Sequence, residues 1–175
     1  MSTERRQRDQ LIDGHRHRAL ADLQTWRVLR DELGAVRAEE MLKRAQFAYG
    51  HTIGTSFKKF APADLKGLCD AFLASLPDAG RPFEPEVAHL DSQRLEIRLH
   101  RSPYVRTWRE AGVSETELGA LARISAAMWA GMFKGAGFRF VGKDVHDGSG
   151  DVHVLHIERT APSHSERHAD HPVGY

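Results

Sequence analysis

Apolar residues recur at helical spacing through the first third of the chain. The first pattern runs from Leu20 to Leu33 and stops at Gly34, which predicts a helix of about four turns. The polar residues 1–18 before it are expected to form a frayed arm. A second pattern begins at Val36 and continues to residue 60, which predicts another helix with one buried face.

Two glycines lie four residues apart inside the second predicted helix. Gly50 and Gly54 each cost about 1 kcal/mol relative to alanine in a helix, and neither has a side chain to hold a neighbour away. The pair therefore either permits a close helix crossing or marks a kink, and we favour the crossing. Pro62 ends this helix, and Asp64 can cap a third one. Cys69 lies beside the apolar stripe of that third helix, as a small core residue rather than a nucleophile.

The pattern changes to short alternating segments in the second half. Residues 83–90 and 95–100 are joined by a turn-prone Asp-Ser pair, which predicts a β-hairpin. Residues 138–142 and 151–158 predict a second hairpin, because the loop between them contains two glycines.

Helical signals separate the two hairpins. A short amphipathic helix ends at Gly112, and Ser114 with Glu117 forms a capping box for a longer helix. The predicted fold class is α+β, with an antiparallel sheet of about four strands from two β-hairpins, packed with about five helices. Residues 1–160 are expected to form a single domain, followed by a polar, histidine-containing tail at 161–175.

Composition and charge narrow the function classes. The chain has 175 residues, and 25 Lys and Arg against 24 Asp and Glu give a net charge of +1. The mixed signs argue against nucleic-acid binding, which uses clustered cations. The N-terminus is charged where a secretory signal is apolar, and the longest nearly apolar run, 125–133, is too short for a membrane span. With one cysteine and therefore no disulfide framework, we expect a cytoplasmic protein without membrane contact.

Familiar cofactor and catalytic motifs are missing from the sequence. It contains no GxSxG, HExxH or Walker motif, and no GxGxxG that opens a helix after a strand. We therefore predict no cofactor and no metal. The tail histidines His164 and His168 would share a face of a helix, but a polar terminal tail is more often simply solvated.

The last predicted strand carries the most informative residue. His153 shares a face with Leu155 and Ile157, so it is a buried imidazole if that face meets the helices. Continued alternation of the 95–99 strand also directs Arg101 inward, where a guanidinium needs a carboxylate from a ligand or from the protein, such as Glu110 or Asp144. The two side chains would then form a pocket for a small carboxylate, with Tyr104 and Trp108 just beyond.

The second half of the chain resembles a known enzyme family. The segments LEIRLHRSPY (95–104), WREAG (108–112), GFRF (137–140) and GDVHVLHI (150–157) are similar, in order and spacing, to the L-2-amino-thiazoline-4-carboxylic acid hydrolase family. The resemblance implies a small α+β protein. It also implies hydrolysis of a carbon–nitrogen bond in a small amino-acid-derived heterocycle or cyclic amidine.

The family's cysteines are absent from this chain. Ser102 follows Arg101 where the family has cysteine, Ala122 and Ser125 lie near the second cysteine position, and His153 or Val154 stands at the third. Cysteine chemistry is therefore not carried over.

The sequence favours a hydrolase-like enzyme, with small-molecule binding as the alternative. In the enzyme interpretation, His153 is the general acid or base, Arg101 holds the substrate carboxylate, and Tyr104 or Ser102 donates a hydrogen bond to developing charge. In the alternative, the scaffold binds a small molecule as a sensor or carrier without reaction. The predicted pocket is lined by side chains that include Trp108, Trp129 and Met132. A homodimer through the N-terminal helices also remains open, with Leu23, Trp26 and Leu33 at its surface. Alternatively, the same residues cover the protein's own sheet.

Overall fold

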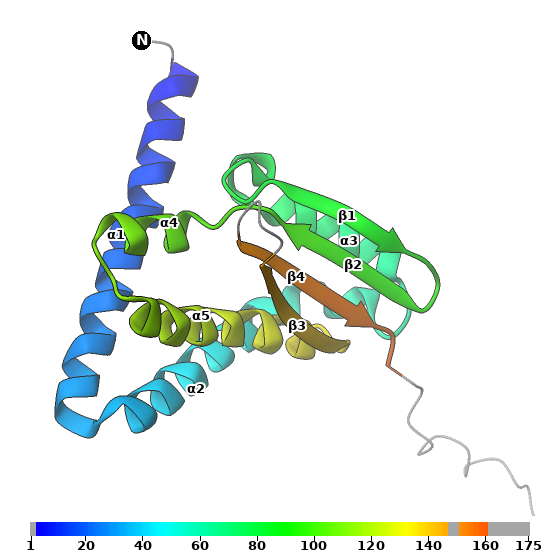
Figure 1. Ribbon diagram of the computed structural model, residues 1–175. Helices are drawn as coiled ribbons and strands as arrows, with labels where there is room; N and C mark the ends of the chain where they lie inside the picture. The colour runs from blue at the N-terminus through cyan, green and yellow to red at the C-terminus, as the bar shows by residue number, and fades with distance from the viewer. Residues whose placement is uncertain (1–2, 147–150, 161–175) are drawn as a thin grey trace, which may run out of the picture.

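The structure, a computed structural model, describes residues 3–146 and 151–160, with side chains described for 10–142 and 152–160. Within these residues the chain forms five α-helices, two short 3₁₀ helices and one four-stranded antiparallel sheet (Figure 1). The predicted α+β class is confirmed, with two hairpins supplying the strands. The predicted tail at 161–175 lies outside the described residues.

Two long helices begin the chain. Helix α1 spans Thr3–Leu33 and α2 spans Ala35–Gly54, joined at Gly34, whose φ of 81° allows the sharp reversal. The prediction of a frayed arm at 1–18 is wrong from Thr3 onward. These residues include five Arg and two Gln, which favour helix but give no apolar periodicity. The turn Thr55–Phe60 (η1) continues α2 as a 3₁₀ helix.

Local capping starts the next helix as the sequence predicts. Helix α3 spans Leu65–Ser75, and the Asp64 carboxylate accepts a hydrogen bond from the Gly67 N–H at 2.8 Å. The short 3₁₀ helix Pro77–Gly80 (η2) then leads to the first hairpin. Cys69 is buried in α3, and this burial raises the pKa of its thiol, as expected for a core cysteine.

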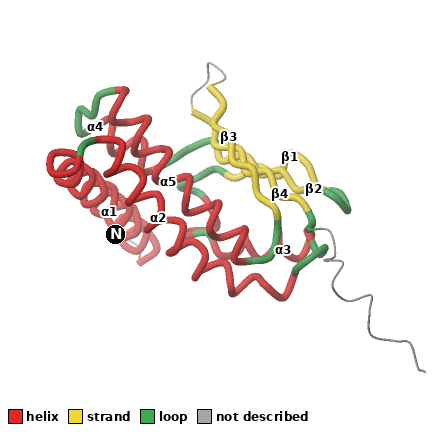
Figure 2. The backbone as a smooth tube through the Cα atoms, turned by 90° about the horizontal axis from the view of Figure 1, so that it is seen from below, coloured by secondary structure: helices red, strands yellow, loops and turns green. Residues whose placement is uncertain are grey.

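The sheet combines the two hairpins in the order β1-β2-β4-β3. Strands β1 (Pro85–Leu90) and β2 (Arg94–Leu99) form one hairpin, and β3 (Arg139–His146) and β4 (Asp151–Glu158) form the other. The central pair β2–β4 places Ile97 opposite Leu155. The helices lie on one side of the sheet (Figure 2).

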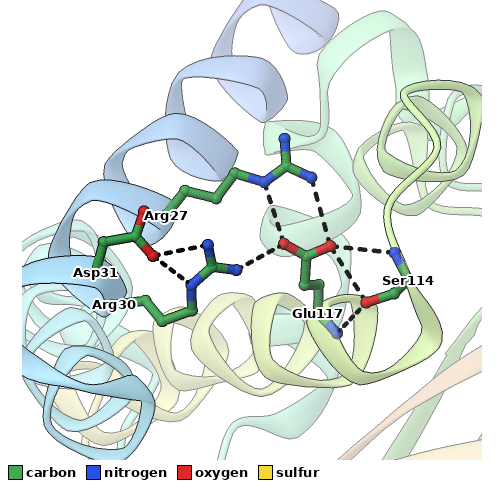
Figure 3. Close-up of polar contacts among 5 residues, drawn as sticks. All are labelled: Arg27, Arg30, Asp31, Ser114 and Glu117. Carbon is green, nitrogen blue, oxygen red and sulfur yellow. Dashed lines mark hydrogen bonds and ion pairs between the residues drawn. The ribbon is translucent and has the colours of Figure 1, made fainter.

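Two helices connect the hairpins. Helix α4 spans Pro103–Glu110, and α5 spans Glu115–Gly135 behind the predicted capping box of Ser114 and Glu117. The Glu117 carboxylate also accepts hydrogen bonds from Arg27 at 3.1 Å and from Arg30 at 2.9 Å (Figure 3). The bonds from Arg27 are the main reason that the pKa of Glu117 falls to about 2. One acid therefore caps α5 and ties α1 to it.

Helix α5 passes through two hydrophobic clusters. Its second half, with Met132 and Phe133, packs with α3 and the inner face of the sheet. Its first half, with Leu121, packs with α1 and α4. Leu23 and Trp26 belong to this second cluster and are 1% and 3% exposed. These two residues therefore pack within the chain and not at a dimer surface.

Helices α2 and α5 run parallel and touch through their backbones. A Cβ placed on Gly50 would lie 2.9 Å from the carbonyl carbon of Met128, and one placed on Gly131 would lie 2.8 Å from that of Phe47. Gly54 and Gly135 repeat these contacts one turn later. The close crossing predicted for the α2 glycines is confirmed: they face the backbone of α5 at Met128 and Met132, and a second pair of glycines on α5 faces the backbone of α2 in the same way.

Candidate functional site

A broad open groove of about 1120 Å³ runs along the parallel helices α2 and α5 and ends against the sheet. It is lined by one face of α2, one face of α5 and three residues of strands β3 and β4. The described lining residues are Met41, Lys43, Arg44, Ala45, Phe47, Ala48, Arg123, Ala126, Ala127, Ala130, Phe140, Gly142 and His153.

Small side chains keep the floor of the groove open. Ala45 and Ala48 lie one turn apart on α2, and Ala126, Ala127 and Ala130 form the matching face of α5. Because methyl groups extend a short distance from a helix, the space above the helix pair remains available. The glycine contacts hold the two helices side by side, with no side chains between their backbones at these positions.

Cations surround this apolar floor, and they differ in how they are neutralised. Arg123 donates to both carboxylate oxygens of Glu39, at 2.7 and 2.8 Å. The hydrogen bonds from Arg123 lower the pKa of Glu39, so this acid is ionised at neutral pH. Lys43 lies 3.9 Å from the same acid. Among the described residues, Arg44 has no ion-pair partner. Lys134 does not line the groove, and its Nζ lies 5.7 Å from the centre of the Phe47 ring.

The structure places His153 on the inner face of the sheet, as the alternation predicts. His153 pairs with Leu99 on β2 and with Asp144 on β3. It lies on the same face of the sheet as the next pair, Ile97 and Leu155, which is buried. Its side chain is half-buried and lines the groove. Of the residues predicted from the sequence to form the site, it is the one found in the described groove lining.

Arg101 does not share a pocket with His153. Its side chain is 66% exposed, and its Nε lies 3.1 Å from the Glu84 carboxylate. The expectation that it points inward is wrong, and its partner is Glu84 and not Glu110, which pairs with Arg106; the side chain of Asp144, the other expected partner, lies outside the described residues. Alternation holds to Leu99, where β2 ends, and beyond that point the chain turns into α4.

Ser102 and Tyr104 lie at the start of α4. The Ser102 hydroxyl accepts a hydrogen bond from the Val105 N–H at 3.2 Å, so it caps the helix. Tyr104 is half-buried between α1 and α4, and its hydroxyl lies 3.5 Å from Nδ1 of His15. Neither residue is among those that line the groove.

The remaining predicted lining residues belong to the hydrophobic core. Trp108 is 1% exposed, and its indole N–H donates to the carbonyl of Ala19 at 2.8 Å. Met132 is 4% exposed, and Trp129 packs edge-on against Phe72. These side chains stabilise the packing of α4 and α5 and do not line the described groove.

Tyr104 instead belongs to a polar cluster that the sequence did not predict. His15, Arg18 and Asp22 follow one face of α1 and meet Tyr104 from α4 and Tyr49 from α2. The Arg18 guanidinium lies 5.0 Å from the centre of the Tyr49 ring and donates to its hydroxyl at 3.5 Å. The cluster therefore contains an imidazole, a guanidinium, a carboxyl group and two phenols.

Burial shifts the titration of this cluster. It lowers the pKa of His15, with a further contribution from Arg18, and it raises the pKa of Asp22 and of Tyr104. Among the described residues, the buried Nε2 atom of His15 has no hydrogen-bond partner. Groups with pKa values moved in this way occur often at functional sites, although buried structural clusters show them too.

Two further features of the described part of the chain concern metals and membranes. No three His, Cys, Asp or Glu side chains lie together there as ligands for a metal ion. None of the helices there combines the length and apolar character needed to cross a bilayer.

Comparison of the chain with protein-family models, with curated proteins and with solved structures gives no match. The resemblance to the hydrolase family therefore rests on the quoted segments of the sequence, and the function must be argued from the groove and the cluster themselves.

Proposed function

We propose that the protein binds a small, largely apolar organic molecule in the groove between α2, α5 and the β3–β4 hairpin, as a carrier or sensor. The observation that carries the proposal is the groove itself, with a volume of about 1120 Å³ over five alanines. Sites for drug-sized ligands have volumes of roughly 300–1,000 Å³ and mostly apolar walls.

The few polar groups of the groove support the same function. His153 and Arg44 line the groove beside its apolar floor. In small-molecule sites a few polar groups of this kind orient the ligand, and apolar contacts supply most of the affinity. Phe47 from α2 and Phe140 from β3 add flat apolar surfaces to the lining. Ring contacts of this kind suit a planar or chain-like apolar body.

A dye-binding experiment tests the proposal. Nile red is neutral and fluoresces on entering an apolar site, so the full chain is expected to bind it saturably. Ala127→Trp fills the floor of the groove and should weaken binding at least tenfold. Ala21→Trp, at an exposed position of α1, is the matched control and should bind as the native chain does. Equal binding by the two folded variants would refute the groove as the site.

Hydrolysis of a carbon–nitrogen bond is the second candidate function. The observation that favours it is the cluster around Tyr104, in which His15 and Asp22 are separate candidate acid–base groups and Arg18 is a candidate carboxylate-binding group. Water would add to the amidine carbon of the heterocycle, one of these groups would accept its proton, and the ring nitrogen would leave protonated. The residues first predicted for this reaction, His153 and Arg101, lie apart from the cluster.

Turnover of L-2-aminothiazoline-4-carboxylate, followed by mass spectrometry, tests this candidate. Loss of turnover in His15→Gln with retention in His153→Gln would support the Tyr104 cluster. The opposite result would support His153 in the groove. No turnover by the native chain would leave binding as the function.

A further inference from the structure

The lining of the groove carries more positive than negative charge. Lys43 and Arg44 on α2 and Arg123 on α5 line it, and no acidic side chain is among its described lining residues. Glu39 is the acid in ion-pair contact with this set, through Arg123 and Lys43. Two of the three cations therefore share one carboxylate, and Arg44 is outside this ion-pair set.

Arg123 is already committed to Glu39. Both of its hydrogen bonds to that carboxylate are short, and their two-point geometry is the strongest form of this pair. A ligand that used Arg123 would have to displace Glu39 and leave a half-buried carboxylate, with a side chain 19% exposed, without its partner. Arg123 is therefore a poor anchor for an incoming anion.

Arg44, unlike Arg123, is not paired with a carboxylate among the described residues. It follows Met41 by three residues and precedes Ala48 by four, so it stands on the same face of α2 as the apolar floor. Among the described residues it forms no ion pair and no hydrogen bond. Its guanidinium can therefore receive a carboxylate in two-point fashion without breaking an existing contact.

We infer that the ligand of the groove is a small amphipathic carboxylate, whose charged end pairs with Arg44 and whose apolar body lies on the alanine floor. This inference rests on the proposed function and adds the chemical class of the ligand. The apolar floor beside a cationic edge excludes a purely polar anion as the best fit. Three cations around a single groove, in a chain of net charge +1, are too few for a nucleic-acid backbone.

Two ligands that differ in charge alone test the inference. We would titrate the full chain with 2-naphthoate and with 2-naphthalenemethanol by isothermal titration calorimetry at pH 7, where the acid is ionised. Native protein is expected to bind the carboxylate about tenfold or more tightly than the alcohol, because a charge-assisted pair is added to the same ring contacts. Rising salt should reduce the difference.

Three substitutions locate the charge contact. Arg44→Gln is expected to weaken naphthoate binding about tenfold and to change binding of the alcohol less than twofold. Arg37→Gln, at an exposed position of α2 outside the groove, is the matched control and should change neither. Glu39→Gln frees Arg123 and removes the nearby negative charge, so it should strengthen naphthoate binding several-fold.

The outcomes separate this inference from the function on which it rests. Equal affinity for the two ligands, or an Arg44→Gln variant that binds naphthoate normally, would overturn the carboxylate assignment while alcohol binding kept the groove as a binding site. If neither ligand bound and Ala127→Trp left the affinity for Nile red unchanged, both the inference and the proposed function would fail.

Discussion

Replacing Gly131 by alanine tests the backbone contact between α2 and α5. The new Cβ would overlap the carbonyl oxygen of Phe47 and lie 2.8 Å from its carbonyl carbon and 3.0 Å from the amide nitrogen of His51. Carbon atoms in contact stay about 3.5–4.0 Å apart, so the two helices would have to separate by roughly 1 Å. The obstructing atoms are backbone, which cannot rotate away as a side chain does.

The size of the effect follows from two opposed contributions. A gap of about 1 Å removes up to half of the dispersion attraction across a contact, and overpacking of this kind costs about 1–3 kcal/mol or more. Alanine returns about 1 kcal/mol through its better helix propensity. Because the same separation recurs along the whole helix pair, we expect a net loss of about 2 kcal/mol.

Gly119 offers a matched control on the same helix. A Cβ there would meet the flexible guanidinium of Arg123 at 3.3 Å, so Gly119→Ala should gain up to about 1 kcal/mol of stability. Urea denaturation and thermal denaturation, each followed by circular dichroism, measure both variants. For a domain of this size, the melting temperature should fall by roughly 4–8 °C in Gly131→Ala and rise by roughly 2–4 °C in Gly119→Ala. Equal stabilisation of the two variants would show that the helices are not in backbone contact.

Three further predictions concern buried and charged groups. Trp108→Phe leaves the Ala19 carbonyl without its indole donor and should lower the free energy of unfolding by about 1–3 kcal/mol in urea, and an unchanged midpoint would contradict this role. Because the pKa of His15 is lowered in the folded chain, the unfolded chain binds the proton more readily, so stability is full above about pH 6.5 and declines below it. His15→Gln should flatten that decline below pH 6.5. The pKa of Glu117 is about 2 in the folded chain. Its ion pairs therefore contribute fully to stability above the ordinary pKa of a glutamate, and this contribution is lost as pH falls toward 2. Glu117→Gln should therefore be less stable by about 1 kcal/mol at pH 7 and as stable as the native chain near pH 2.

Elements with strong local signals were predictable from the sequence. The Asp64 cap and the Ser114–Glu117 capping box act within one turn of their helices, so their residues alone identify the helix starts. Alternation through Leu95 and Ile97 identified the inner face of the sheet, because successive side chains of a strand point to opposite sides. The same rule placed His153 on that face.

Features set by distant contacts were not predictable in the same way. Arg101 lies two residues beyond the end of β2, so alternation no longer determines its direction, and Glu84 provides a partner at the surface. The groove depends on the contact of α2 with α5, which are far apart in sequence. Its one local signal is the run of Ala126, Ala127 and Ala130, which resembles any small-residue helix face until Gly131 is seen to meet Phe47.

The parallel direction of α2 and α5 has a consequence for how the chain reaches its native state. Helices that follow each other closely in sequence pack antiparallel, whereas a parallel pair requires the intervening chain to travel back along its whole length. Glu39 and Arg123, which join the two helices, are 84 residues apart. Closing so large a loop slows folding, so this mostly helical chain should fold in milliseconds to seconds, at the pace typical of β-rich topologies.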